Sequence, residues 1–236
     1  MTQPAAEGWA RWWQGRAAPD FIAREVVGPH GIADLVAVQF DSAALRTRAT
    51  AGILAIQDVG ALRAILACRR SARSTADLVR ILGLSESSVR RAVRIGCEAG
   101  ALQRVDARRH LAHAGWRPIA RRLVAVELKR SDWRRAANQL WAYQGWASSA
   151  WLVLGKRPPL SAIEGLWRMG MGLGYLGDDG NTQVVLRPKT KRLSGIASIW
   201  AGEQTLGRAL ASGIDPLTSS KGDCARSTGG LAVPVG

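Results

Sequence analysis

Three short apolar runs constrain the fold of this chain more than any other feature. IADLVAVQF (32–40), RRLVAVELK (121–129) and SAWLVLG (149–155) are each long enough for one buried β-strand and are bounded by turn-forming or charged residues. FIAREVV (21–27), followed by a PHG turn, predicts an additional strand. MGLGYLGDDGNTQVVLRPK (171–189) predicts a hairpin, because DDGN separates two strand-like halves.

Helical patterns lie between and after these strands. The segments at 131–147, 160–170 and 193–211 are predicted helices, and Ser131 is the candidate N-cap of the first. Residues 1–45 and 117–211 are therefore expected to form one discontinuous core. The Ser-, Gly- and Pro-rich end, 212–236, is expected to be a flexible tail.

The segment between the first strands and the 121–129 strand has a different character. Residues 57–70 have helical periodicity, Ser74 or Thr75 begins a second short helix, and Gly83 allows a tight turn. Ser85 caps a third helix that extends to Gly100, and the alternation after it predicts a two-stranded ribbon. This order of elements is that of a winged helix-turn-helix, inserted at 57–114. An inner apolar face is expected from Ala76, Leu78, Val79, Ile81, Leu82, Leu84, Val89 and Val93.

Net charge indicates a polyanionic partner. The chain carries 33 basic and 18 acidic residues, and 16 arginines against five acidic residues lie between positions 46 and 122. A genome rich in G and C favours Arg over Lys, but it does not explain this excess of positive charge. Nucleic acid is the simplest partner for such a surface. The side chains expected to contact DNA lie on the third helix or in the ribbon of the insert: Ser85, Ser87, Arg90, Arg91, Arg94, Arg108 and Arg109. The alternative is that the insert docks on another protein.

The end of the 121–129 strand holds the first lysine of the chain. Glu127 and Lys129 lie two residues apart, so a strand presents both side chains on one face. The acid–x–Lys pattern alone is weak, and a surface ion pair on an edge strand would also produce it. Its context is more specific, since Asp34 is an isolated acid in another apolar strand, and Gln139 and Tyr143 share one face of the following helix.

These motifs resemble the PD-(D/E)xK nuclease superfamily, and QLWAY resembles the Q-x-x-x-Y helix of its RecB-like members. The similarity covers about 20–47 and 117–155 and rests on Asp34 in GIADLVAV and Glu127 to Lys129 in VAVELK. Glu25 matches an additional acid that many members carry. Ala33 stands where many members have proline. The resemblance implies an α/β fold with a mixed central sheet flanked by helices.

It also implies a nuclease that needs Mg²⁺ or Mn²⁺ and hydrolyses phosphodiester bonds of DNA. Asp34, Glu127 and the Leu128 carbonyl would hold the metal, and Lys129 would orient a metal-bound water and stabilise negative charge. Lys suits this role because it is a compact cation whose pKa responds to burial. Glu25, Gln139 and Tyr143 would complete the catalytic group. We expect the insert to lie near the active-site edge and to deliver duplex or branched DNA.

Two other functions compete with this hypothesis. One is a DNA-binding or regulatory protein on a nuclease-like fold that no longer cuts, and the other is a winged-helix regulator with flanking dimerisation segments. A homodimer would suit cleavage of both strands. The three cysteines have no metal-site spacing, and Cys68 and Cys97 are expected to be buried. With no signal peptide and no membrane span in the sequence, a cytoplasmic location is expected.

Overall fold

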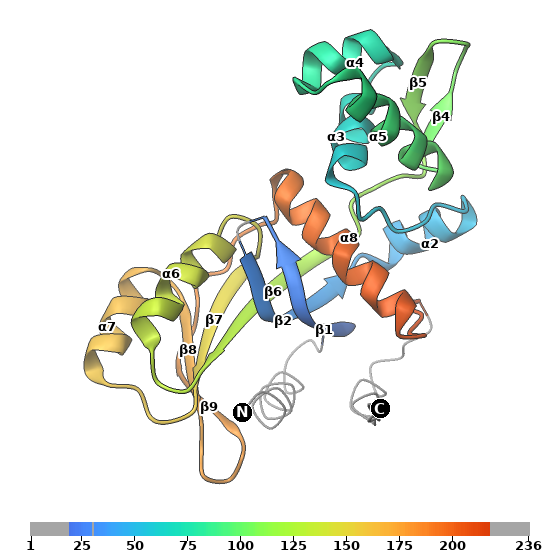
Figure 1. Cartoon of the computed structure of the whole chain (residues 1–236). Helices are drawn as coiled ribbons and strands as arrows, with labels where there is room; N and C mark the ends of the chain where they lie inside the picture. The colour runs from blue at the N-terminus through green and yellow to red at the C-terminus, as the bar shows by residue number, and fades with distance from the viewer. Residues whose placement is uncertain (1–18, 30, 218–236) are drawn as a thin grey trace, which may run out of the picture.

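A computed structural model describes residues 19–29 and 31–217 of the chain (Figure 1). It is an α/β protein with a six-stranded mixed sheet in the order β1-β2-β6-β7-β8-β9. The strands are β1 (Phe21–Gly28), β2 (Gly31–Phe40), β6 (Ala120–Lys129), β7 (Ser149–Leu154), β8 (Gly172–Leu176) and β9 (Thr182–Leu186). The four predicted single strands are therefore present within one residue of their expected bounds, and the predicted hairpin occupies 172–186.

The sheet combines two directions of pairing. β1 pairs with β2 and β2 with β6 in antiparallel fashion, β6, β7 and β8 run parallel, and β8 and β9 form the predicted antiparallel hairpin. Crossover helices explain the parallel part: α6 (Trp133–Tyr143) joins β6 to β7, and α7 (Leu160–Arg168) joins β7 to β8. The C-terminal ends of the three parallel strands consequently meet at one edge of the sheet.

Two hydrophobic clusters cover the two faces of this sheet. The larger contains Val36, Leu123 and Ala125 together with residues of α6 and of the last helix, α8 (Gly195–Ala211). The other contains Leu35, Val126 and their neighbours on the opposite face. The alternation of side chains along β2 and β6 thus separates the two clusters, as the period of a strand requires.

The segment between β2 and β6 begins with α2 (Ser42–Thr50), a helix that the sequence patterns did not predict. It continues with α3 (Val59–Ala67), α4 (Thr75–Leu82) and α5 (Glu86–Glu98) and a small antiparallel sheet in the order β3-β5-β4. The strands are β3 (Arg73–Ser74), β4 (Leu102–Arg104) and β5 (Arg109–Ala112). We call residues 57–114 the insert.

Local rules explain the helices of the insert. Ser74 caps α4 in a reciprocal capping box with Asp77, and Ser85 caps α5 through the backbone N–H of Ser88. Gly83 ends α4 with φ of 64°, a conformation that favours glycine. The predicted caps Ser74 and Ser85 are therefore confirmed.

Several local expectations were wrong. Asp132, not Ser131, caps α6, because its side chain accepts the hydrogen bond from the Arg135 N–H. Cys97 is exposed, whereas Cys68 is buried as expected. Ala76 and Ile81 lie on the outer side of α4, where only Leu78 is fully buried, because an eight-residue helix turns just one narrow stripe toward the core.

The C-terminal helix α8 contributes to two hydrophobic cores. Its residues Ala201, Leu206 and Ala209 belong to the core of the main sheet. Ile199 and Trp200 pack against the core of the insert, which is built on Leu62, Ile65 and their buried neighbours. Figure 1 shows α8 extending from the insert along the main sheet. The part of the expected tail at 218–236 lies outside the described residues.

Candidate active site

The register between β2 and β6 brings two acidic side chains to one end of the sheet. Leu35 pairs with Val126, and the same antiparallel register places Asp34 opposite Glu127. Opposed residues of this kind have Cβ atoms about 4.5–5.5 Å apart on one face. The backbone N–H of Leu128 donates to Asp34 Oδ2 at 2.7 Å, which fixes the Asp34 carboxylate beside the end of β6.

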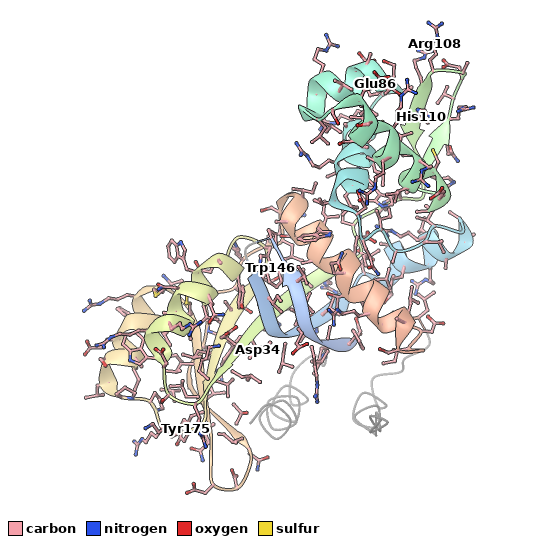
Figure 2. The ribbon with its side chains drawn as sticks, viewed as in Figure 1. Asp34, Glu86, Arg108, His110, Trp146 and Tyr175 are labelled. Carbon is pink, nitrogen blue, oxygen red and sulfur yellow. The ribbon has the colours of Figure 1, made fainter. Side chains whose placement is uncertain are left out.

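Lys129 completes the group from the same strand. Its Nζ lies 2.5 Å from Glu127 Oε1, so the two side chains share a face, as the alternation predicts. Glu127 is only 1% exposed, whereas Lys129 is 27% exposed. The buried Glu127 carboxylate is thus paired with the Lys129 ammonium group, which reaches solvent at the end of β6. Asp34, Glu127 and Lys129, distant in the chain, are brought together at this edge (Asp34 is labelled in Figure 2).

Tyr143 of α6 contacts the same carboxylate. Its hydroxyl lies 2.8 Å from Glu127 Oε2 and 2.7 Å from the Ile32 carbonyl, and its one proton serves one acceptor at a time. Burial raises the pKa of this hydroxyl well above its ordinary value, and the nearby Glu127 and Asp34 charges raise it further. Tyr143 therefore remains a neutral donor that orients Glu127.

Gln139 lies one helical turn before Tyr143 and carries an unsatisfied buried atom. Its Oε1 is buried and accepts no hydrogen bond from the described residues. Because Gln139 and Tyr143 share a helix face, this acceptor is directed to the same side of α6 as the Tyr143 hydroxyl. Most buried acceptors in proteins have a donor, so this oxygen is available to a water, an ion or a ligand.

Glu25 of β1 lies opposite Asp34 of β2, and β6 pairs with β2 along its other long edge. The pairs Arg24–Leu35 and Val26–Ala33 leave Glu25 opposite Asp34. Glu25 has φ of 50°, is exposed, and is the one non-glycine residue with positive φ in the described chain. Arg208 of α8 holds this stretch by donating to the carbonyls of residues 24 and 25 at 2.7 and 2.9 Å. Within residues 19–29 and 31–217, no three His, Cys, Asp or Glu side chains gather as a metal site, so Glu25 does not join the two carboxylates.

The remaining oxygen donors fit a hard divalent cation that keeps most of its water. Mg²⁺ commonly takes only one or two protein carboxylates, with water and phosphate at its other positions. Asp34 and Glu127 provide two carboxylates. Since the N–H and C=O of one strand residue face the same neighbour, the Leu128 carbonyl lies on the side where its N–H meets Asp34.

The predicted DNA contacts on α5 are exposed but internally paired. Arg90 binds Glu86 at 2.5 Å, Arg94 binds Glu98 at 3.3 Å, and Arg91 lies 3.5 Å from Asp58 of the α3 cap. Ser85 and Ser87 lie at the N-terminal end of α5, where their hydroxyls are 3.1 Å apart. Exposed pairs such as these contribute little to stability and exchange readily for phosphate.

The tip of the β4–β5 ribbon carries the other two predicted contacts. Asp106 accepts hydrogen bonds from the N–H groups of Arg108 and Arg109 and from the Arg109 guanidinium. These backbone and side-chain donors lower the pKa of Asp106 to about 2. Between the ribbon and α5 lies an open groove of about 800 Å³, whose basic lining is Arg90, Arg94, Arg104 and Arg108. Of the seven predicted contacts, Arg90 and Arg94 on α5 and Arg108 in the ribbon line this groove, together with the acidic Glu86 and Glu98.

The expected position of the insert beside the active-site edge is wrong. β2 leaves the site at Asp34 and reaches Phe40, and Phe40 pairs with Ala120, where the chain returns. The insert is consequently attached at the opposite end of β2 and β6. Figure 2 shows Arg108 and Glu86 in the insert, well separated from Asp34 in the sheet. The order of elements in the sequence indicated that the insert interrupts the core. It did not indicate at which end of β2 and β6 the insert is attached.

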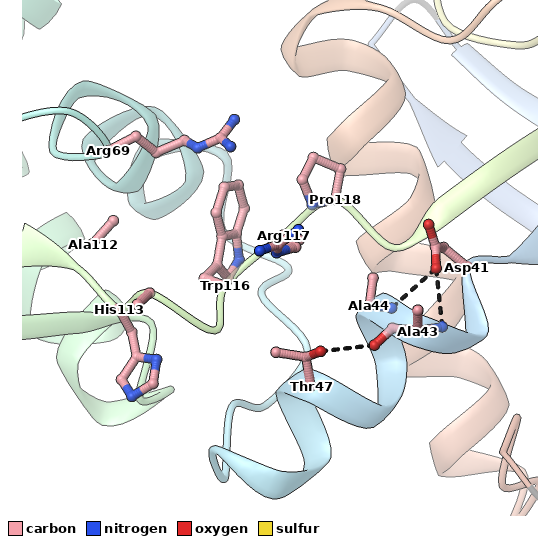
Figure 3. Close-up of a pocket in the computed structure, with 11 residues that line it drawn as sticks. Asp41, Ala43, Ala44, Thr47, Arg69, Ala112, His113, Trp116, Arg117 and Pro118 are labelled. Atoms are coloured by element: carbon pink, nitrogen blue, oxygen red, sulfur yellow. Dashed lines mark hydrogen bonds between the residues drawn. The ribbon is translucent and has the colours of Figure 1, made fainter.

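A separate hollow lies where the insert meets the main sheet. It has a volume of about 540 Å³ between α2 and the loop after β5, with Thr47, Arg69, His113 and Trp116 among its lining residues (Figure 3). None of the acidic or basic side chains around Asp34 lines it. We therefore place the candidate active site at the C-terminal end of β6, beside Asp34 of β2, and not in this hollow.

Sequence reasoning missed two contributors to the site. The Ile32 carbonyl shares the Tyr143 proton, and Arg208 braces β1 beside Asp34. Both contacts join segments more than 100 residues apart, and no local pattern marks them.

The described chain contains no helix long and apolar enough to span a membrane. Comparisons with protein-family models, curated proteins and solved structures find no match.

Proposed function

We propose that this protein is a metal-dependent DNA nuclease that hydrolyses phosphodiester bonds. The observation that carries the proposal is the meeting of Asp34, Glu127 and Lys129 at one edge of a mixed sheet. Clustering two carboxylates at a partly buried site is costly unless they serve a cation. The arrangement agrees with the resemblance to PD-(D/E)xK nucleases, which supports a restriction-endonuclease-like core.

Each side chain has a distinct proposed role. Asp34, Glu127 and the Leu128 carbonyl would hold Mg²⁺ or Mn²⁺, which when bound lowers the pKa of a water and neutralises phosphate charge. Lys129 presents its ammonium group beside Glu127, where it orients the attacking water and stabilises negative charge on the phosphate. Tyr143 is a positioning residue, because it acts on Glu127 through its hydrogen bond.

The insert is proposed to bind DNA as a winged helix-turn-helix. Three helices, a glycine turn between α4 and α5 and a following ribbon occur in the order typical of that motif. The groove between α5 and the ribbon is lined by four arginines and two glutamates, so its net charge is positive. Its positive charge favours phosphate contacts whose strength falls as salt is raised.

A DNA-binding protein without cleavage activity is the second candidate. The observation in its favour is that both oxygens of Glu127 already have partners, Lys129 on Oε1 and Tyr143 on Oε2. Metal binding would require Glu127 to share one of these oxygens. This candidate predicts salt-dependent DNA binding with no strand scission under any metal condition.

A plasmid-nicking assay tests the proposal. We expect nicking with Mg²⁺ or Mn²⁺ and none in chelator. Lys129→Ala and Glu127→Gln should reduce the rate by at least about 100-fold, in line with the loss of charge-stabilising groups in other active sites. Lys156→Ala is the matched control, because this lysine is exposed just past the end of the adjacent parallel strand β7.

Metal binding has a readout that does not depend on activity. A ligand present at 100 times its Kd stabilises a protein by about 2.7 kcal/mol, so Mn²⁺ should raise the melting temperature of the parent protein. Asp34→Asn should remove that increase while leaving DNA affinity unchanged. An equal increase in both proteins would place the metal elsewhere, and cleavage that persists in chelator would rule out the metal-dependent mechanism.

A further inference from the structure

The insert and the candidate active site lie at opposite ends of the same two strands. From Asp34 to Phe40, β2 advances six residues, which corresponds to roughly 20 Å in an extended strand. The pair Phe40–Ala120 marks the end at which the insert is attached. The arginine-lined groove lies between α5 and the ribbon. Figure 1 shows both of these elements farther from the main sheet than α2. The distance along the sheet is therefore a minimum separation between the groove and the site.

Buried polar contacts fix both chain segments that connect the insert to the main sheet. Glu203 of α8 binds Arg48 at 2.5 Å and accepts from the Ile56 N–H at 2.9 Å. Arg48 also donates from Nε to the Arg117 carbonyl at 2.8 Å, on the returning segment. Glu203 and Arg48 are 0% and 2% exposed, so this pair is protected from solvent.

Neighbouring residues of α8 strengthen the same attachment. Trp200 Nε1 and Gln204 Nε2 both donate to the Gln57 carbonyl, at 2.8 and 2.9 Å. Trp116 on the returning segment is buried, with the guanidinium of Arg48 5.3 Å from its ring centroid. Together with the apolar residues that α8 gives to both cores, these contacts hold the insert in one position relative to the sheet.

We infer that the protein takes duplex DNA that extends from the insert to the active site and cuts it at a constant offset from the bound segment. This inference rests on the proposed nuclease function and specifies its substrate. At 3.4 Å per base pair, a separation of roughly 20 Å corresponds to about six base pairs as the minimum offset. Duplexes too short to span both sites lose the phosphate contacts of the insert and are cut slowly.

The test is the rate of cleavage of blunt, end-labelled duplexes of increasing length, with Mn²⁺ at a fixed low salt concentration. For the parent protein, kcat/KM should increase by about tenfold or more once the duplex spans both sites. The cuts should lie at least about six base pairs from the insert-bound end. Arg90, Arg94 and Arg108 changed together to Ala should remove this length dependence, so that long duplexes are cut no faster than short ones.

A triple variant with the same loss of charge is the control. Arg135, Arg157 and Arg168 are exposed and lie outside the insert, so their joint change to Ala should preserve the length threshold. Equal rates for short and long duplexes with the parent, or a threshold that survives loss of the insert arginines, would overturn the inference while leaving the nuclease proposal intact. Absence of cleavage at every length would instead overturn the nuclease proposal, and the constant offset with it.

Discussion

The buried pair of Arg48 and Glu203 offers a quantitative test of how the insert is attached. Glu203→Ala removes both carboxylate oxygens, one bound to Arg48 and the other to the Ile56 N–H. The Arg48 guanidinium then remains almost fully buried. Its remaining partners are the Arg117 carbonyl and the ring of Trp116. An uncompensated buried charge is the main cost of this change.

The size of the effect follows from burial. Removing one member of a buried ion pair costs about 3–5 kcal/mol, and a chain of this size loses about 2–4 °C of Tm per kcal/mol. Glu203→Ala should therefore lower the melting temperature by about 6–20 °C. The double variant Arg48→Met with Glu203→Leu should be more stable than Glu203→Ala alone, because it removes both charges and refills much of the volume.

Urea denaturation followed by circular dichroism measures these free energies of unfolding. Glu86→Gln is the control, because it breaks the exposed pair with Arg90 and should cost less than about 0.5 kcal/mol. A loss below about 1 kcal/mol for Glu203→Ala would refute the argument that this pair fixes the insert. Equal losses in the single and double variants would show that shape, and not the unpaired charge, sets the cost.

Two further predictions concern single groups. Tyr143→Phe leaves Glu127 Oε2 without its donor, so it should cost about 1–3 kcal/mol in urea denaturation and lower kcat in the nicking assay. Its pH profile should match that of the parent, because the raised pKa keeps the Tyr143 hydroxyl protonated throughout, and a lost alkaline limb would contradict this. Asp106 has a depressed pKa, so its contribution to the ribbon tip is complete above the ordinary pKa of about 4 and is lost as pH falls through about 2. An NMR titration that gave Asp106 a pKa near 4 would remove this role.

The sequence was sufficient for features that depend on local patterns. β2 and β6 are recognisable because they are apolar runs with β-branched residues, and a period of two was enough to place Glu127 and Lys129 on one face. Ser74 and Ser85 were recognised as caps from short-range hydrogen-bonding rules.

Other features depend on contacts that no local pattern encodes. α2 was missed because SAALRTRAT has no clear apolar stripe, although Asp41 caps it. Glu203 and Arg48 are separated by 155 residues, and only the folded chain shows that their charges pair. The end of β2 and β6 at which the insert is attached follows from the direction of β2 in the sheet, which short sequence patterns do not reveal.

The double role of α8 has a consequence for how the protein is made. Ile199 and Trp200 complete one core, and Ala201 and Leu206 complete the other, yet all four are synthesised after every strand of both sheets. Until this helix leaves the ribosome, apolar surface of both the main sheet and the insert remains exposed to solvent. A nascent chain arrested before residue 195 should therefore need chaperone protection that one arrested beyond α8 does not.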